Sequence, residues 1–340
     1  MNKYDSSSVK VLTGAEAVRK RPGMFFGKLN EAGVNRVLFE VITNSIDQYL
    51  AKHSTMIRVE FEDNIIRISD DGKGLPFDKA SPENSEQNLV EYYFTTLHTS
   101  ATADIHIPHV HVNLIGVGLA AVNAVCENIS VTSFNGQKKF NQRFGKGKII
   151  APLTVEKDVS PSGTLTEIRI DEKIFGSAKP DLISLRKTLF EIAHFYPGLI
   201  IHLNTECFCT KNGLLDLAQI YYQGKPANSN VDIPTRFSFE GQHEKVWISA
   251  AAIGQENTKT ETQFISWVNG SATVLDGVHV QSFKKALHKI GWKPSIALIH
   301  TIMHHPKYAG PSKDAFTSTE AGEAIEILLH KPLKELKLIK

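Results

Sequence analysis

Hydrophobic residues recur at two spacings along the chain, and each spacing predicts a different element. Residues 33–52 place apolar side chains such as Leu38 and Ile42 at helical intervals, which predicts one long helix. The runs MIRVEFED (56–63) and IIRISDD (65–71) alternate apolar and polar residues around an Asp-Asn turn, which predicts a β-hairpin. The same patterns predict further helices at 14–20, 87–98, 118–126, 181–195, 279–290 and 319–330, and further strands at 129–134, 138–144, 164–170, 198–204, 245–253, 263–270 and 295–303.

This mixture of elements predicts an α+β protein, with an antiparallel or mixed sheet that carries helices on one face. Residues 1–13 are polar and serine-rich, which is typical of an arm. The first α/β unit is expected at 14–213, and a second begins at about residue 214 and runs to 340.

Composition narrows the class of protein. Of the 340 residues, 41% are hydrophobic and 22% are charged, which is typical of a soluble globular chain. Lys and Arg total 38 against 36 Asp and Glu, so no global charge attracts nucleic acid. No signal peptide and no apolar run of membrane-spanning length is present, and three cysteines form no closed disulfide framework, so we expect a cytoplasmic protein without a membrane partner.

Three polar segments carry candidate chemistry. Glu40, Asn44 and Asp47 fall within about 60° of one another on the long helix, although the residues around them are apolar. A strand ends in the run DDGKGLP (70–76), and Gly-Val-Gly (116–118) precedes an apolar helix. A glycine-preceded helix N-terminus suits phosphate, a carboxylate can polarise water, and an amide can complete a Mg²⁺ site.

Each segment alone also has a plain structural interpretation. A Gly-x-Gly before a helix is more often a tight turn than a phosphate site, DDGKG can be an ordinary hairpin turn, and a helical asparagine is often a core amide. His106, His109 and His111 suggest a zinc site, but their spacing matches no strong signature, so we favour a solvated loop.

Taken together, these segments and YDSSSVKVLTGAEAVRKRPGMFFG (4–27) resemble the N-terminal ATPase region of the DNA gyrase B and topoisomerase IV family. That family has a Bergerat (GHKL) ATP-binding domain, followed by a ribosomal-S5-like transducer domain. FISWVNGSATVLDGVHVQSFKKAL (264–287) resembles the transducer, and HPKYAGPSKDAF (305–316) resembles its loop with a phosphate-sensing lysine. The resemblance implies an arm at 1–13, a GHKL domain at 14–213 and a transducer at 214–340.

The resemblance implies a role for each matching residue. Glu40 corresponds to the general base, Asn44 to the Mg²⁺ ligand and Asp70 to the acceptor of the adenine amino group. The other implied nucleotide contacts are Asp47 and Leu75, Tyr4 in the arm, Gly74 and Pro76 at the adenine, Gly116, Val117 and Gly118 at the phosphates, Thr164 through water, and Lys313 at the γ-phosphate.

The chain departs from the family around the phosphates. The family's lid motif is Gly-Gly-Leu-His-Gly-Val-Gly, and here the corresponding residues 112–118 read VNLIGVG. No Lys or Arg occurs between Lys79 and Lys138, so cationic partners for the triphosphate are missing from the lid. Arg36 replaces a histidine that lies near the general base in the family. Thr43 replaces an aspartate, and Phe134 stands where an arginine is usual.

The sequence therefore predicts an ATP-binding, Mg²⁺-dependent ATPase that works as a dimerisation clamp, with slow turnover and without a DNA-cleavage domain. The expected partners are a second copy through the arm and a topoisomerase A-type or cleavage subunit, with DNA contacted only indirectly. An alternative is a weak or inactive GHKL module that regulates or decoys a type II topoisomerase. A chaperone- or kinase-type relative is a third hypothesis, which the transducer resemblance disfavours.

Overall fold

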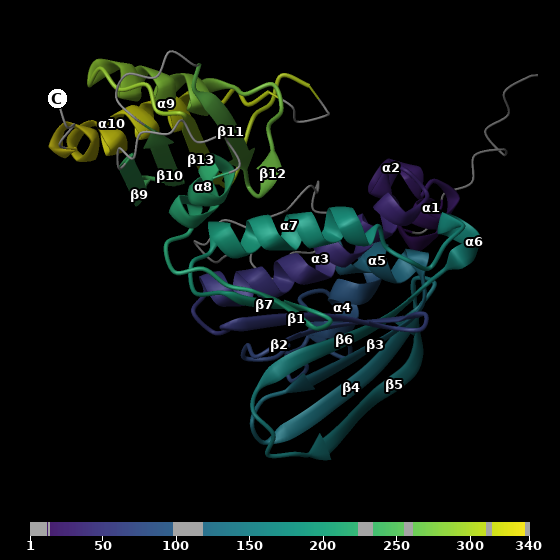
Figure 1. Ribbon diagram of the computed structural model, residues 1–340. Coiled ribbons are helices and arrows are strands. Elements are labelled where there is room, and N and C mark those ends of the chain that lie inside the picture. The colour runs from purple at the N-terminus through teal and green to yellow at the C-terminus, as the bar shows by residue number, and fades with distance from the viewer. Residues whose placement is uncertain are drawn as a thin grey trace, which may run out of the picture. The chain divides into compact units, whose positions relative to one another are not determined.

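The computed structural model describes residues 12, 14–97, 118–223, 234–254, 261–310 and 315–336, and the chain divides into two compact units (Figure 1). Among these residues, the first unit comprises 12, 14–97, 118–186 and 201–207, and the second comprises 187–200, 208–223, 234–254, 261–310 and 315–336. The expected domain boundary after residue 213 stays a prediction.

The first unit is built on an eight-stranded sheet with the order β5-β4-β3-β6-β2-β1-β7-β8. Every pair from β5 to β1 is antiparallel, and the helices of the unit lie on one face of the sheet (Figure 1). This arrangement confirms the predicted fold class. The strands are β1 (Met56–Glu62), β2 (Ile65–Asp70), β3 (Cys126–Phe134), β4 (Lys138–Gly145), β5 (Lys148–Lys157), β6 (Gly163–Ile170), β7 (Ile200–Leu203) and β8 (Glu206–Phe208).

Helix α3 (Glu31–Leu50) is the long helix that the apolar spacing predicts, and it packs on β1 and β2. Its N-terminus is capped by Asn30, whose Oδ1 accepts a hydrogen bond of 3.1 Å from the amide of Ala32. Leu38 and Ile42 are fully buried, so burial of this face fixes the rotation of the helix about its axis. The other helices that belong to or begin in this unit are α1 (Gly14–Lys20), α2 (Gly23–Phe26), α4 (Leu89–Thr95), α5 (Gly118–Val125), α6 (Glu172–Phe175) and α7 (Leu182–Phe195).

The second unit has a five-stranded mixed sheet with the order β12-β11-β13-β10-β9, in which β11 and β13 are parallel. Alternate residues of its strands, among them Ile248 and Ile299, share one core with Phe283 of α9 and Ile325 of α10. The elements are α8 (Leu214–Gln223), β9 (Thr235–His243), β10 (Val246–Gly254), β11 (Gln263–Val268), β12 (Ser271–Ala272), α9 (Val278–Lys289), β13 (Ile296–Met303) and α10 (Thr319–Glu335).

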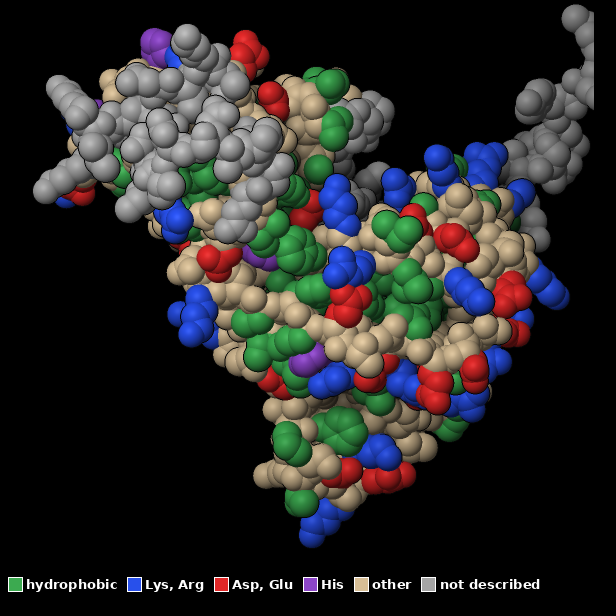
Figure 2. Space-filling model, viewed as in Figure 1, with side chains coloured by type: hydrophobic (Ala, Val, Ile, Leu, Met, Phe, Trp, Pro, Cys, Tyr) green, Lys and Arg blue, Asp and Glu red, His purple; other side chains and the backbone are tan. Residues whose placement is uncertain are grey.

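The free end of the eight-stranded sheet is exposed. Strand β5 is exposed at eight of its ten residues, including Ile149 and Val155, because no described element covers it on the outer side. Figure 2 shows hydrophobic, acidic and basic side chains interspersed at this end, over β4 and β5. Within the described part of the chain, no helix is long and apolar enough to cross a membrane.

Candidate functional site

The polar stripe of α3 lies at the border between its buried and exposed faces. Glu40 is only 4% exposed, Asp47 is half-buried and Asn44 is exposed. Nδ2 of Asn44 donates a 2.9 Å hydrogen bond to the carbonyl oxygen of Glu40, one turn earlier. Oδ1, the atom that a hard cation prefers, therefore stays available as an acceptor at the surface of the helix.

Asp70 is bound directly to this helix. Its Oδ2 accepts a 2.7 Å hydrogen bond from Oγ of Ser45, the residue after Asn44, and its Oδ1 accepts a 3.0 Å bond from the amide of Gly72. Burial raises the pKa of Asp70, while the hydrogen bonds from Ser45 and Gly72 lower it, and the net shift is upward. The carboxyl at the end of β2 is therefore hydrogen-bonded to α3 at the residue that follows Asn44 of the stripe.

The turn after Asp70 packs so closely on β3 that residue 74 has no room for a side chain. Gly74 has a φ of 79°, and a Cβ there would lie 2.6 Å from both Oγ of Ser133 and the carbonyl oxygen of Phe134. The amide of Leu75, the next residue, donates a 2.7 Å hydrogen bond to the same Ser133 hydroxyl. This turn is thus fastened to β3, close to the carboxyl of Asp70.

Thr164 and Pro76 complete the described part of the site. Thr164 lies opposite Asp70 in the β2–β6 register, and Pro76 follows Leu75 and is half-buried. Gly118 is the first residue of α5 and has a φ of 75°, which agrees with its place at the end of a glycine motif. Tyr4, Gly116, Val117 and Lys313 lie outside the described residues, as do the histidines at 106, 109 and 111.

The second acid of the DDGKG run has a different role from the first. Asp71 accepts hydrogen bonds from Oγ of Ser54, from the amide and Oγ1 of Thr55, and from the amide of Met56, at 2.6–2.9 Å. Burial opposes ionisation, but these bonds outweigh it and lower the pKa of Asp71 to about 2. Asp71 thus fastens the connection between α3 and β1 and does not face the site.

Sequence reasoning missed the two hydroxyls that position the site, those of Ser45 and Ser133. Both side chains are almost fully buried among apolar neighbours, at 3% and 1% exposure. A buried hydroxyl needs a hydrogen-bond partner, so a serine on the apolar face of a predicted helix or strand was the available signal. The substituted Thr43 is also buried and donates to the carbonyl oxygen of Phe39 at 2.9 Å.

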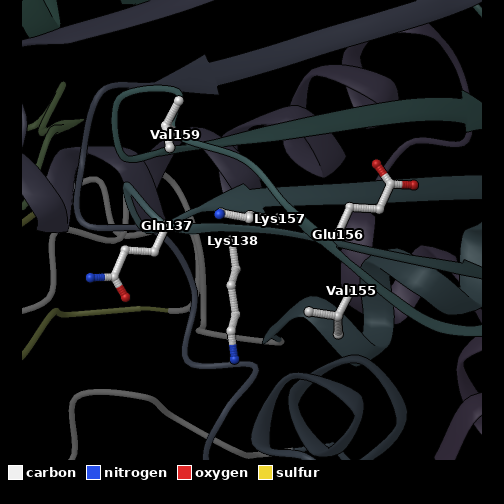
Figure 3. A pocket seen from close by; sticks show the side chains of 6 residues that line it. All are labelled: Gln137, Lys138, Val155, Glu156, Lys157 and Val159. Atoms are coloured by element: carbon white, nitrogen blue, oxygen red, sulfur yellow. The ribbon is translucent and has the colours of Figure 1, made fainter.

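A separate hollow of about 530 Å³ lies at the exposed end of the sheet (Figure 3). It shares no residue with the site around Asp70, so we do not assign it to the nucleotide. Its walls come from the end of β5, the start of β4 and the residues next to them in the connections between strands: Gln137, Lys138, Val155, Glu156, Lys157 and Val159.

Comparison with known proteins shows which family the sequence resembles. Residues 29–172 match the family of histidine kinase-, DNA gyrase B-, and HSP90-like ATPases. The DNA gyrase B protein of Thermotoga maritima is 29% identical over 99% of the chain, and that of Streptococcus pneumoniae is 31% identical over 84%. The chain is a relative of the ATPase region of the DNA gyrase B family. It covers 57% and 45% of the lengths of these two proteins.

Solved structures confirm the fold. The 43K ATPase domain of Thermus thermophilus gyrase B matches with a TM-score of 0.81 and 24% identity, over 95% of this chain and 90% of that one. The ATPase region of Saccharomyces cerevisiae topoisomerase II matches with a TM-score of 0.67 and 18% identity, over 92% and 91%. The gyrase B-type architecture, a GHKL domain with a second α/β domain, is therefore present, and the similarity supports an ATP-binding module.

Proposed function

We propose that the chain binds ATP with Mg²⁺ between α3 and the turn after β2, and hydrolyses it slowly as a dimerisation clamp. The observation that carries this proposal is the half-buried Asp70 carboxyl, held by Ser45 of α3 and the Gly72 amide beside a glycine turn. In this role Asp70 accepts a hydrogen bond from the adenine amino group. Gly74 lets the base approach the backbone, Leu75 and Pro76 border it, and Thr164 supports it through water.

Other residues are suited to bind the phosphates and the Mg²⁺ ion. Oδ1 of Asn44 would hold Mg²⁺, which neutralises charge on the triphosphate, and Asp47 lies one turn further along α3. The Gly116-Val117-Gly118 segment would bind phosphate oxygens at the start of α5, and Lys313 would reach the γ-phosphate.

Glu40 is the proposed general base. It takes a proton from water while the water oxygen bonds to the terminal phosphorus and the bond to the departing ADP breaks. A carboxylate that is 4% exposed on the stripe of the Mg²⁺ ligand suits this step, because its environment is fixed and largely dry.

In this proposal ATP favours a closed dimer over open monomers, and residues 1–13 with Tyr4 reach the second copy. Residues 214–340 act as the transducer. A topoisomerase A-type or cleavage subunit would be the further partner, and DNA would be contacted through it.

A Glu40→Ala variant tests the catalytic part of the proposal. We expect it to lose hydrolysis and to retain ATP affinity within a few-fold, measured by phosphate release and by calorimetric titration. Equal hydrolysis by the variant and the wild type would remove Glu40 from the mechanism.

One observation favours the second candidate, a weak or inactive module that regulates or decoys a type II topoisomerase. No lysine or arginine occurs at residues 80–137, where the family's lid supplies cations. Tight ATP binding without phosphate release by the wild type would favour this candidate. A chaperone- or kinase-type function is disfavoured, because the gyrase B match of 99% of the chain includes the second unit.

A further inference from the structure

The proposed site needs positive charge at its phosphate end, and α3 carries an arginine there. Arg36, Glu40 and Asn44 follow one another at intervals of four residues, so they lie on one side of the helix about 40° apart. Arg36 is exposed, and none of the described residues gives it a hydrogen bond or an ion pair. No residue in the described part of the fold therefore neutralises the charge of Arg36.

The guanidinium of Arg36 has a defined neighbour. It lies against Gly27, which has a φ of 70° and ends α2; a Cβ at this glycine would collide with Nη1 and lie 3.0 Å from Cζ. The Gly27 amide is in turn bonded to the carbonyl oxygen of Gly23 at 3.0 Å. The Arg36 side chain thus packs against a glycine whose own amide is hydrogen-bonded. Any other residue at position 27 would displace the guanidinium.

The distance along the helix matches the nucleotide. Ser45, which binds Asp70, lies nine residues after Arg36, which is about 13.5 Å along the axis, and Glu40 lies about 6 Å from Arg36. With adenine at Asp70 and Mg²⁺ at Asn44, an extended triphosphate runs toward the N-terminus of α3. Its terminal phosphate then reaches the turn between Glu40 and Arg36.

We infer that Arg36 binds the terminal phosphate of the nucleotide and supplies, from α3, cationic charge that residues 80–137 lack. This inference rests on the proposed function, because it takes adenine to lie at Asp70. A guanidinium presents several N–H donors to phosphate oxygens in a planar fork, whereas an ammonium offers one point charge. It also offsets the repulsion between the Glu40 carboxylate and the triphosphate.

The test compares a non-hydrolysable ATP analogue with ADP, because only the former has the terminal phosphate. We expect Arg36→Ala to weaken binding of the analogue about tenfold or more and to change ADP affinity less than about twofold, measured by calorimetry with Mg²⁺. Arg36→Lys should bind the analogue with an affinity between those of the wild type and Arg36→Ala. It also serves as a control for misfolding of the alanine variant. Arg143→Ala, which removes an exposed arginine of β4 in the same unit, should change neither affinity.

The outcomes separate this inference from the proposed function. A wild type that binds the analogue and ADP, with Arg36 variants that lose both equally or neither, overturns the inference alone. A wild type that binds neither nucleotide overturns the proposed function and the inference with it. A selective loss of the analogue in Arg36→Ala, with an unchanged melting temperature, supports both.

Discussion

Two adjacent carboxyls at the end of β2 are shifted in opposite directions, because their surroundings differ. Burial raises the pKa of Asp70 despite the bonds from Ser45 and Gly72, whereas the bonds from Ser54 and Thr55 outweigh burial and lower the pKa of Asp71. The first carboxyl keeps acceptor capacity near the glycine turn, and the second is used within the fold. We therefore expect Asp70 to serve nucleotide binding and Asp71 to serve stability.

Replacing each acid by its amide tests this separation. Asp70→Asn should lower ATP affinity by about tenfold to a hundredfold, because an amide donor would then face the adenine amino donor. Asp71→Asn should keep ATP affinity within about twofold but lower the free energy of unfolding by about 2 kcal/mol, because bonds to a charged acceptor are lost. Calorimetric titration and chemical denaturation measure the two effects, and the reverse pattern would exchange the roles of the two residues.

At the scale of elements, the turn after β2 is defined by glycine. Gly74→Ala should lower both stability and nucleotide affinity, because its Cβ would lie 2.6 Å from the Phe134 carbonyl oxygen. Gly136→Ala is the matched control: its φ is 83°, yet nothing lies within 4 Å of its added Cβ, so it tests backbone strain alone, of about 1–3 kcal/mol. A larger melting-temperature loss for Gly74→Ala is expected, and equal losses would mean that close approach to β3 contributes nothing.

The elements that the sequence predicted are those whose apolar pattern is strong. Helices α3 and α5 and the β1–β2 hairpin agree with prediction to within about two residues, because each buries one regular face. Strand β5 was missed because eight of its ten residues are exposed and its apolar and polar residues do not alternate. Helix α10 runs through Pro332, past the predicted end at 330, because Leu333 of its last turn is buried in the core of the second unit.

The same physical reason limits prediction of the site. Glu40 and Asn44 were singled out because they interrupt an apolar pattern, and Asp70 because a strand ends there in acids and glycines. Their roles come from the resemblance and stay predictions, while the structure brings Asp70 to the residue that follows Asn44. Ser45 and Ser133 were missed because their partners lie on other elements, and pairing across elements has no signature in sequence spacing.

For the whole molecule, the proposed clamp predicts dimerisation that depends on nucleotide. With a non-hydrolysable ATP analogue and Mg²⁺, the full chain should sediment as a dimer, while a chain lacking residues 1–13 should stay monomeric and still bind the analogue. The reason is that the arm supplies contacts between copies and little of the binding at Asp70. A dimer that forms equally without the arm, or without nucleotide, would contradict the clamp.

The second unit should also respond to acid before the first. Burial lowers the pKa of His279 and of His300 to about 3, and each of these side chains bonds through Nε2, His279 to Oγ1 of Thr273 and His300 to the amide of Gly270. The unfolded state binds protons below about pH 6.5 and the folded state does not, so stability is present above 6.5 and falls as the pH decreases toward 3. The loss is about 1 kcal/mol per histidine per pH unit.

Tryptophan fluorescence isolates this effect, because all three tryptophans, at 247, 267 and 292, lie in the second unit. The fluorescence melting temperature should fall between pH 7 and 5. His279→Gln should reduce the slope without abolishing it, because His300 and His194, whose pKa is also lowered by burial, remain. Asp71, with a pKa of about 2, loses its contribution only as the pH falls from its ordinary value of 3.8 through 2, so the first unit should be less affected over the same interval. A fluorescence transition that does not move between pH 7 and 5 would show that these histidines are accessible to protons in the folded chain, and their burial would then have no energetic consequence.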